Sequence, residues 1–326
     1  MAFTHLHVHS HYSLLQAVPK IDELVKKAKE FGMTALALTD NGNMYGAIEF
    51  YKECTAKGIK PIIGVDFYVA PRTRHDKEGR LDTKRTRHIL LAKNYEGYLH
   101  LIKLVTDSNI EGYYYKPRID TELIQKYNDN LVCILPFWNS KISEALKVDD
   151  TDVADAEYTI LKEAYGAENI FYEITRHEEL EQHAKLEARV LTFIEKHNIQ
   201  PVATNDVFYM NPEDKKARAT MMSIQSGSTE RFIEDDADLS FVSPERMEEM
   251  FCDTENPTRD RHFKQALANT QVIADMCTVV IELGKWVFPK MDLPEGKNAD
   301  EALRDVVYEG FAKRNVTVQL EADGYA

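Results

Sequence analysis

The chain has 326 residues, of which 44% are hydrophobic and 29% charged, as is typical of a soluble globular protein with one large core and a smaller appendage. It contains no apolar run of about 18 residues, and it begins without the basic and apolar regions of a secretory signal, so we expect neither a membrane span nor export. Four widely spaced cysteines without a CxxC pair predict reduced thiols and a cytoplasmic location.

The formal net charge of −14 argues against a free-standing nucleic-acid-binding protein, but the charge is distributed unevenly. Residues 1–118 contain 18 Lys and Arg against 13 Asp and Glu, whereas the remainder contains 22 against 41. Histidine is uneven as well, because four of the eleven histidines lie within the first eleven residues. The N-terminal part of the chain is therefore where an ionisable site is expected.

Short apolar runs alternate with helical periodicity through the first two thirds of the chain. Strands are predicted over residues 4–8, 35–38, 62–70, 88–92, 131–135, 170–174 and 202–204. Helices are predicted over residues 19–31, 47–56, 98–105, 155–165, 180–197 and 214–224. Seven strands, most of them followed by a helix, predict a parallel sheet of right-handed βαβ units. Because no glycine-rich dinucleotide motif follows the first strand, a (β/α)7-like barrel is favoured over an open sheet.

The pattern changes after residue 228, where an acidic loop precedes two predicted helices over residues 243–251 and 263–276. A stretch punctuated by Pro289, Pro294 and Gly296 indicates a connector, and a further helix is predicted over residues 300–313. We therefore expect a barrel over residues 1–228, a helical extension and connector over residues 229–296, and the start of a further domain over residues 297–326. A last part so short favours a fragment of a longer protein.

His7 and His9 form a His-x-His pair at the end of the first predicted strand. Alternate residues of a strand point to the same face, so both imidazoles can bind one ion. Zinc, manganese and iron are the ions that imidazole suits. The alternative is that the pair lies at a surface edge, which is also the simplest interpretation of His5 and His11.

Polar or ionisable residues recur at the ends of the other predicted strands, namely Asp40, Asn41, Asp66, His88, His177 and Asp206. In barrel enzymes the loops at one rim bring such residues together. Taken singly, Asp40 and Asp206 are equally well explained as caps of the helices that follow them. Their recurrence around the sheet favours a shared site at the rim.

Six segments, in order along the chain, carry a resemblance to a known family: LHVHSHYSLL, ALALTDNGNMYGAIEFY, GIKPIIGVDFYVA, HILLAKNYEGYLHL, YYKPRID and PVATND. They resemble the PHP (polymerase and histidinol phosphatase) domain, and more narrowly the N-terminal region of the alpha subunits of bacterial DNA polymerase III. The later segments FVSPERMEEMF, LGKWVFPKMDLPEG and EALRDVVYEGF are similar to the region C-terminal to that domain in those subunits. The resemblance implies an α/β fold, a distorted (β/α)7 barrel followed by a small, mostly helical segment that leads toward the polymerase thumb and palm.

The resemblance also implies a rim site of up to three divalent metals held by about nine ligands. Five positions of this chain keep a residue that could bind a metal, with Asp standing for the family's Glu at position 66. These remnant ligands are His7, His9, Asp66, His88 and Asp206.

Four further positions depart from the family pattern. Gln16 stands where Asp is usual, Asn41 where His is usual, Phe137 where Cys or His is usual, and Phe208 where His is usual. Neutral amides bind transition metals poorly, and the phenyl rings offer no donor atom. We therefore expect a degenerate site with at most one divalent metal, zinc or manganese, and little or no phosphoesterase activity.

An arginine-rich stretch, residues 72–87, links two predicted strands and has a net charge of +4. Its candidates for contact with the phosphates of a template or primer, or with an acidic partner, are Arg72, Arg74, Arg85 and Arg87. The alternative is a solvated, mobile loop. The resemblance further suggests that Arg118 lies near the metal rim, and that Trp138 beside Phe137 fills space left by missing metals.

Three functions are compatible with these patterns. The first is the PHP region of a replicative polymerase alpha subunit. Such a region would brace the remainder of that subunit or dock a proofreading exonuclease, and it would meet DNA only through the parent enzyme. The parent reaction uses Mg²⁺, but no acidic palm motif lies in these residues, so the chain alone is not expected to polymerise DNA. The second is a metal-dependent phosphoesterase, either a 3′–5′ exonuclease or a phosphatase of small phosphate esters. The third is a regulatory homologue that binds a partner; no membrane partner is expected.

Overall fold

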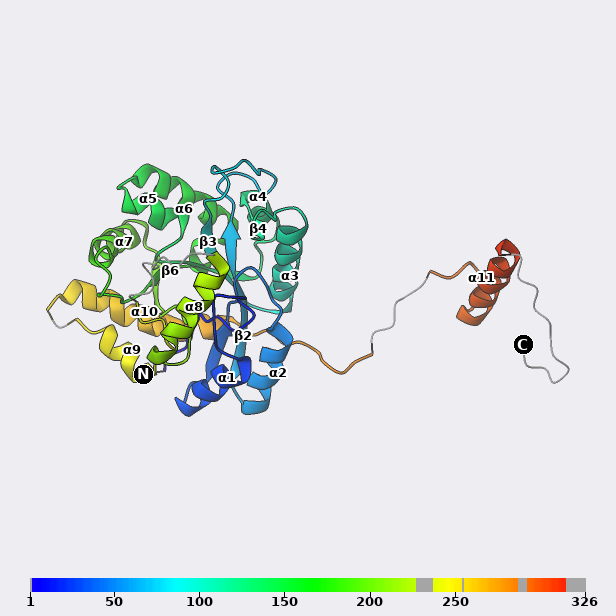
Figure 1. The fold of residues 1–326 in the computed structure, drawn as a ribbon, viewed down its shortest axis with the longest axis horizontal. Helices are drawn as coiled ribbons and strands as arrows, with labels where there is room; N and C mark the ends of the chain where they lie inside the picture. The colour runs from blue at the N-terminus through cyan, green and yellow to red at the C-terminus, as the bar shows by residue number, and fades with distance from the viewer. Residues whose placement is uncertain (1, 227–236, 254, 287–291, 315–326) are drawn as a thin grey trace. The chain divides into compact units, whose positions relative to one another are not determined.

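The computed structural model describes residues 2–226, 237–253, 255–286 and 292–314. It divides into two compact units, Met1–Ile281 and Glu282–Ala326. The first unit contains a curled sheet covered by helices, and the second contains the helix α11 (Ala299–Lys313) (Figure 1). No helix in the described part of the chain is both long and apolar enough to cross a bilayer. All four cysteines fall within the described residues and carry free thiols.

The elements of the first unit alternate along the chain, as the hydrophobic pattern predicts. Its strands are β1 (Ala35–Leu38), β2 (Lys60–Val69), β3 (Thr86–Ala92), β4 (Arg118–Ile119), β5 (Leu131–Leu135), β6 (Ile170–Ile174) and β7 (Gln200–Ala203). Its α-helices are α1 (Ile21–Glu30), α2 (Ala47–Lys57), α3 (Tyr95–Ile110), α4 (Thr121–Lys126), α5 (Lys141–Lys147), α6 (Thr151–Tyr165), α7 (His183–His197), α8 (Lys215–Ser226), α9 (Pro244–Met250) and α10 (Pro257–Met276). The predicted α/β fold with a distorted barrel is confirmed, and the sequence pattern missed the short elements β4, α4 and α5.

The strands pair in the order β1-β2-β3-β5-β6-β7, with β4 on β2. The expectation of an all-parallel sheet is wrong at β3, which pairs antiparallel with both β2 and β5. A parallel neighbour needs a crossover connection, usually a helix, and residues 70–85 contain no helix. The start of β3 therefore lies at the same rim as the end of β2, with Arg87 opposite Tyr68.

The predicted first strand, residues 4–8, is also wrong, because this segment forms only an isolated bridge between Val8 and Val207. Its backbone nevertheless connects the two ends of the sheet. Thr39 N–H donates to Val8 O at 2.8 Å, and His9 N–H donates to Val207 O at 2.9 Å. The N-terminal segment thus lies between β1 and the residues after β7, and this position brings both histidines of the His-x-His pair to the rim.

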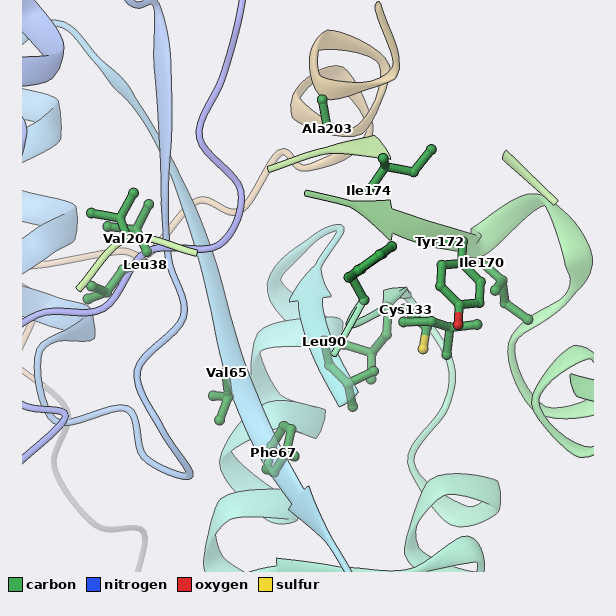
Figure 2. Close-up of a cluster of buried hydrophobic side chains, with 14 of the residues drawn as sticks. Leu38, Val65, Phe67, Leu90, Cys133, Ile170, Tyr172, Ile174, Ala203 and Val207 are labelled. Carbon is green, nitrogen blue, oxygen red and sulfur yellow. The ribbon is translucent and has the colours of Figure 1, made fainter. Parts of the chain in front are cut away.

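Alternate residues of the strands divide the core into two layers. Side chains on the inner face fill the barrel: Leu6, Ala35, Ala37, Ile62, Ile89, Leu91, Val132, Ile134, Phe171 and Val202. Side chains on the outer face, among them Val65, Phe67, Leu90, Cys133 and Tyr172, pack in a separate cluster with the surrounding helices (Figure 2). Burial of each large apolar side chain stabilises the fold by about 1.5–3 kcal/mol, so the face on which a residue lies is strongly fixed.

Helix α10 covers the end of the barrel opposite the rim. Its Ile273 and Ala274 join the inner layer, and Asn269 Nδ2 donates to Pro201 O at 2.7 Å. The described residues between 237 and 281 therefore belong to the same compact unit as the barrel. The domain boundary at residue 228 stays a prediction. The acidic loop and Pro289 lie outside the described residues.

Candidate metal centre

His7, His9 and Asp206 converge at the rim of the barrel. Asp206 Oδ1 lies 3.1 Å from Nε2 of each histidine, and the three ligand atoms lie within 4.8 Å of one another. Two ligands that each lie about 2.0–2.1 Å from a tetrahedral zinc ion are roughly 3.4 Å apart, so this spacing fits one divalent ion. Asp206 has a φ of 49°, in the left-handed region that side chains rarely adopt, and such strain is characteristic of functional positions.

Glu173 of β6 orients the first of these histidines. Its Oε1 accepts a hydrogen bond from His7 Nδ1 at 2.7 Å, and its Oε2 accepts one from the backbone N–H of Phe137 at 2.8 Å. A carboxylate on one ring nitrogen fixes the tautomer and leaves the lone pair of Nε2 for an ion. Glu173 was not among the residues predicted from the sequence, although a single acidic residue inside the apolar run IFYEI was a usable signal.

Asp40 supports the second histidine through a serine. Ser13 Oγ donates to Asp40 Oδ1 at 2.6 Å and lies 3.4 Å from His9 Nδ1, while Ser10 Oγ donates to Asp40 Oδ2 at 2.7 Å. Asp40 is buried and does not reach the ligand atoms. It holds the turn after the His-x-His pair, so its role is to position His9.

The other side of the rim is occupied by an arginine. Arg87 Nε donates to Asp66 Oδ1 at 2.9 Å, and its Nη2 contacts both Asp66 Oδ2 and Asn41 Oδ1. Asn41 Nδ2 in turn donates to Gln16 Oε1 at 2.7 Å. The two amides that the sequence resemblance predicts at ligand positions therefore belong to a hydrogen-bond network that ends on the Arg87 guanidinium. Asp66 also stays close to the histidines, because its Oδ2 lies 3.2 Å from His7 Nε2.

The charges of the cluster shift one another's pKa values. Burial lowers the pKa of His7, but the carboxylates of Asp206, Glu173 and Asp66 outweigh burial and hold that pKa well above its usual range. Burial raises the pKa of Asp66, but Arg87 and His7 outweigh it, so the pKa of that carboxyl is lowered. Without a metal, the cluster is held together as ion pairs, and an ion must displace the His7 proton in order to bind.

Aromatic rings occupy the two remaining positions where the sequence resemblance predicts that ligands have been replaced. The Phe208 ring stacks on His9 with 4.2 Å between ring centroids. Phe137 is fully buried, with its ring 5.0 Å from that of His183. Trp138, which packs edge-on against Phe137, lines the cleft in front of the site. Neither phenylalanine offers an atom that could bind a metal.

The centre opens into a cleft of about 260 Å³. Its lining includes four cationic side chains, Arg85, Arg87, Lys116 and Arg218. Two of the predicted phosphate-contacting arginines, Arg85 and Arg87, therefore lie at the cleft.

The other two predicted phosphate-contacting residues are held by carboxylates. Arg72 Nη2 lies 2.6 Å from Asp82 Oδ2, and Arg74 Nη1 lies 3.1 Å from Asp120 Oδ2. One of these pairs lies within the arginine-rich stretch, and the other joins it to Asp120.

The structure does not bring His88 to the site. His88 follows Arg87 on β3 and therefore points to the opposite face, the outer layer to which Phe67 and Leu90 belong. Burial lowers the pKa of His88, and Glu157 is the carboxylate with the strongest effect on it.

Arg118 and His177, which were predicted near the rim, also lie away from the ligand atoms, and His5 differs from its predicted place at a surface edge. Arg118 is fully buried and donates to backbone carbonyls, including those of Gly112 at 3.0 Å and Asp82 at 3.1 Å. His177 is buried at a different cleft, with its Nδ1 3.4 Å from Glu179 Oε1. His5 is not at a surface edge, because it is buried and its Nε2 lies 2.9 Å from Val242 O; burial lowers its pKa to about 4.

Comparisons with known proteins identify the family. The sequence matches the PHP domain family over residues 5–177. It is 33% identical to DNA polymerase III subunit alpha of Aquifex aeolicus, over 96% of this chain and 28% of that protein, and 36% identical to that of Thermus aquaticus, over 96% and 26%. The chain thus spans about a quarter of the length of these curated relatives.

Among solved structures, an amidohydrolase from Chromobacterium violaceum with bound sulfate and no metal aligns with a TM-score of 0.42 at 13% identity. That alignment covers 64% of this chain and 88% of the other. The family match extends over more than half of the sequence and contains the His-x-His pair, Asp66 and Glu173, whereas Asp206 lies beyond its end. The chain therefore belongs to the PHP domain family.

Proposed function

We propose that this chain is the PHP region of a cytoplasmic replicative DNA polymerase III alpha subunit, and that it serves there as a structural and partner-docking module. Its similarity to such subunits along 96% of its length supports this proposal. Its partners are the remainder of the alpha subunit and a proofreading exonuclease subunit, and it meets DNA through the parent enzyme. The Mg²⁺ of DNA synthesis belongs to that enzyme's palm, so the chain alone does not polymerise DNA.

The observation that carries this proposal is the Arg87–Asp66 pair beside the His7–His9–Asp206 group. A cluster of several divalent ions needs carboxylate and imidazole donors in excess. Apart from these three ligands, the described donors at the rim are Glu173, Asp66 and neutral amides. Glu173 is engaged by His7 Nδ1 and by the backbone N–H of Phe137, and Asp66 is neutralised by arginine. The site therefore holds one divalent ion at most, zinc or manganese.

His7, His9 and Asp206 would hold this ion, and Glu173 would orient the first of them. When bound, such an ion supplies Lewis acidity and lowers the pKa of water. The chain's own residues hold and shield the ion: Phe208 covers one face of His9, and buried Glu173 keeps His7 Nε2 directed at the ion. The site is thereby suited to joining the N-terminal segment to the end of the sheet, which is a structural role.

The metal content and the hydrolytic activity of the full chain test this proposal. Protein loaded with Zn²⁺ or Mn²⁺ and then desalted is expected to retain at most one ion per chain by mass spectrometry. Hydrolysis of bis(4-nitrophenyl) phosphate and of end-labelled single-stranded DNA should not exceed that of the variant Asp206→Asn. Two or more ions together with metal-dependent turnover would contradict the degenerate site.

A metal-dependent phosphoesterase is the second candidate function, and one observation favours it. The three-ligand group is intact, and it faces a cleft lined by cationic side chains such as Arg85 and Lys116 that suit a phosphate ester. Turnover that requires a single ion and is lost in Asp206→Asn would establish this function instead. Turnover of end-labelled single-stranded DNA would indicate a 3′–5′ exonuclease, and turnover of small phosphate esters alone would indicate a phosphatase.

The docking role has its own test. The 326-residue chain is mixed with the proofreading exonuclease subunit of the same organism and titrated by calorimetry. A complex of one chain to one subunit is expected, with the same affinity in the presence of EDTA. No heat of binding at micromolar concentrations would remove the exonuclease from the set of partners.

A further inference from the structure

The backbone holds Asp66 and Asn41 next to each other at the rim. The two residues form an isolated parallel bridge, Gly42 N–H donates to Asp66 O at 2.9 Å, and Asp66 N–H donates to Asp40 O at 3.2 Å. Asp66 is 1% exposed and Asn41 is 8% exposed. Their side-chain oxygens therefore converge because the main chain places them there, and the convergence does not depend on flexible side chains.

The point on which these oxygens converge is one nitrogen of Arg87. Its Nη2 contacts Asp66 Oδ2 and Asn41 Oδ1 together. The same Asp66 oxygen lies 3.2 Å from Nε2 of His7, one of the three candidate ligands. One carboxylate oxygen is thus shared between an imidazole and a guanidinium, as a bridging carboxylate is shared between two metal ions. Carboxylate and amide oxygens are ligands that hard divalent cations such as Mn²⁺ accept.

The arginine is held firmly in this position. Arg87 N–H donates to Asn139 O at 2.8 Å, and its guanidinium carbon lies 4.7 Å from the centroid of the Tyr68 ring. Tyr68 is its direct partner in the β2–β3 register. Because a guanidinium is charged at every accessible pH, it neutralises Asp66 permanently, and a second cation at this point would meet like charge.

We propose that Arg87 takes the place of a second divalent cation and that its charge keeps such an ion away from Asp66 and Asn41. This inference rests on the proposed function, in which one ion is the maximum, and it names a residue that contributes to this limit. Removal of the guanidinium leaves the buried Asp66 carboxylate without its cation, beside Asn41. That position then binds a metal ion which shares Asp66 with the first.

The number of Mn²⁺ ions that the full chain binds tests this inference. Wild type, Arg87→Met and Arg87→Gln are titrated with Mn²⁺ at one pH, and bound ions are counted by equilibrium dialysis and by electron paramagnetic resonance. Both variants are expected to bind one ion more than wild type, two in place of one, and to show the exchange-coupled spectrum of two ions about 3.5–4 Å apart. Arg87→Gln keeps a donor to Asp66, which favours folding, and thermal melting confirms the fold of each protein.

Two controls separate the charge of Arg87 from other effects. Arg87→Lys keeps a cation and is expected to bind the same number of ions as wild type. Arg85→Met removes a neighbouring cation of the same cleft that has no contact with Asp66, and it too should leave the number unchanged. The ion count in wild type tests the proposed function, and the difference between variant and wild type tests this inference. Equal counts in wild type and both neutral variants would overturn it, and so would a gain in Arg85→Met.

Discussion

The two sides of the barrel rim neutralise buried carboxylates in different ways. On the imidazole side, which comprises His7, His9, Asp206 and Glu173, the ligand atoms have the spacing of a single-ion site. On the guanidinium side, which comprises Gln16, Asn41, Asp66 and Arg87, a protein cation occupies the point where oxygens converge.

A buried carboxylate needs a counter-charge, and at this rim a metal or an arginine can supply it at adjacent positions of one site. Only the imidazole side leaves room for an exchangeable ion. The two sides meet at the contact between His7 and Asp66, so a substitution on one side should alter the electrostatic interactions of the other.

The largest effect should come from removal of the cation on the guanidinium side. In EDTA, Arg87→Met leaves the buried Asp66 carboxylate with His7 as its remaining charged partner, and we expect the free energy of unfolding in urea to fall by about 3–5 kcal/mol. Arg85→Met, at the same cleft, should change it by no more than about 0.5 kcal/mol. If Arg87→Met were as stable as wild type, the guanidinium would not be the counter-charge of this side.

A smaller effect is expected on the imidazole side from Glu173→Gln. This change removes the carboxylate that orients His7, and loss of such a supporting partner typically weakens metal binding by about 10–100-fold. Competition with a chromophoric zinc chelator measures the dissociation constant. Glu163→Gln, a change of the same kind at an exposed position of α6, serves as the matched control and should leave the constant unaltered.

The contribution of the imidazole side to stability should also depend on pH, through the protonation of His7. The pKa of His7 is raised in the folded chain by Asp206, Glu173 and Asp66 against the effect of burial, so its charged form stabilises the metal-free fold fully below about pH 6.5. In EDTA this stability is lost as the pH rises through the higher folded pKa. With saturating Zn²⁺ the trend reverses, because deprotonated His7 binds the ion.

Thermal melting from about pH 5 to 9, with and without EDTA, measures this response. Only one proton is involved, so we expect a smaller change than in the two substitutions above. The decline in EDTA should be absent in His7→Gln. A melting temperature that rises with pH in EDTA would contradict the assignment of a charged His7 to the metal-free protein.

The smallest effect is expected from an arginine outside the rim. Arg72 pairs with Asp82 but is 44% exposed, so Arg72→Gln should lower the free energy of unfolding by only about 0.2–1 kcal/mol. Asp82 keeps its bond from the backbone N–H of Glu78 at 2.7 Å, which limits the loss. Urea unfolding beside Arg87→Met measures the contrast. Equal losses of unfolding free energy in the two variants would show that burial at the rim does not increase the stability contributed by an arginine–carboxylate pair.

Much of the fold can be predicted from local patterns in the sequence. Helices such as α1 and α7 were predictable because their apolar residues recur at helical spacing, although α7 begins at His183, three residues after its predicted start. The role of residues 4–8 was not predictable, because an extended segment with few partners has the same alternation as a strand. The direction of β3 depends on how the chain returns after β2, and no periodicity within β3 records that direction.

The sequence by itself determined the residue types at the rim, the His-x-His pair and the amides and rings at the four positions where ligands were expected. Tertiary structure alone decided which residues face one another. A strand has a period of two, so the antiparallel register of β3 sends Arg87 to the inner face and His88 to the outer layer. Glu173 likewise becomes a partner of His7 only because β6 and the N-terminal segment, 166 residues apart, end at the same rim.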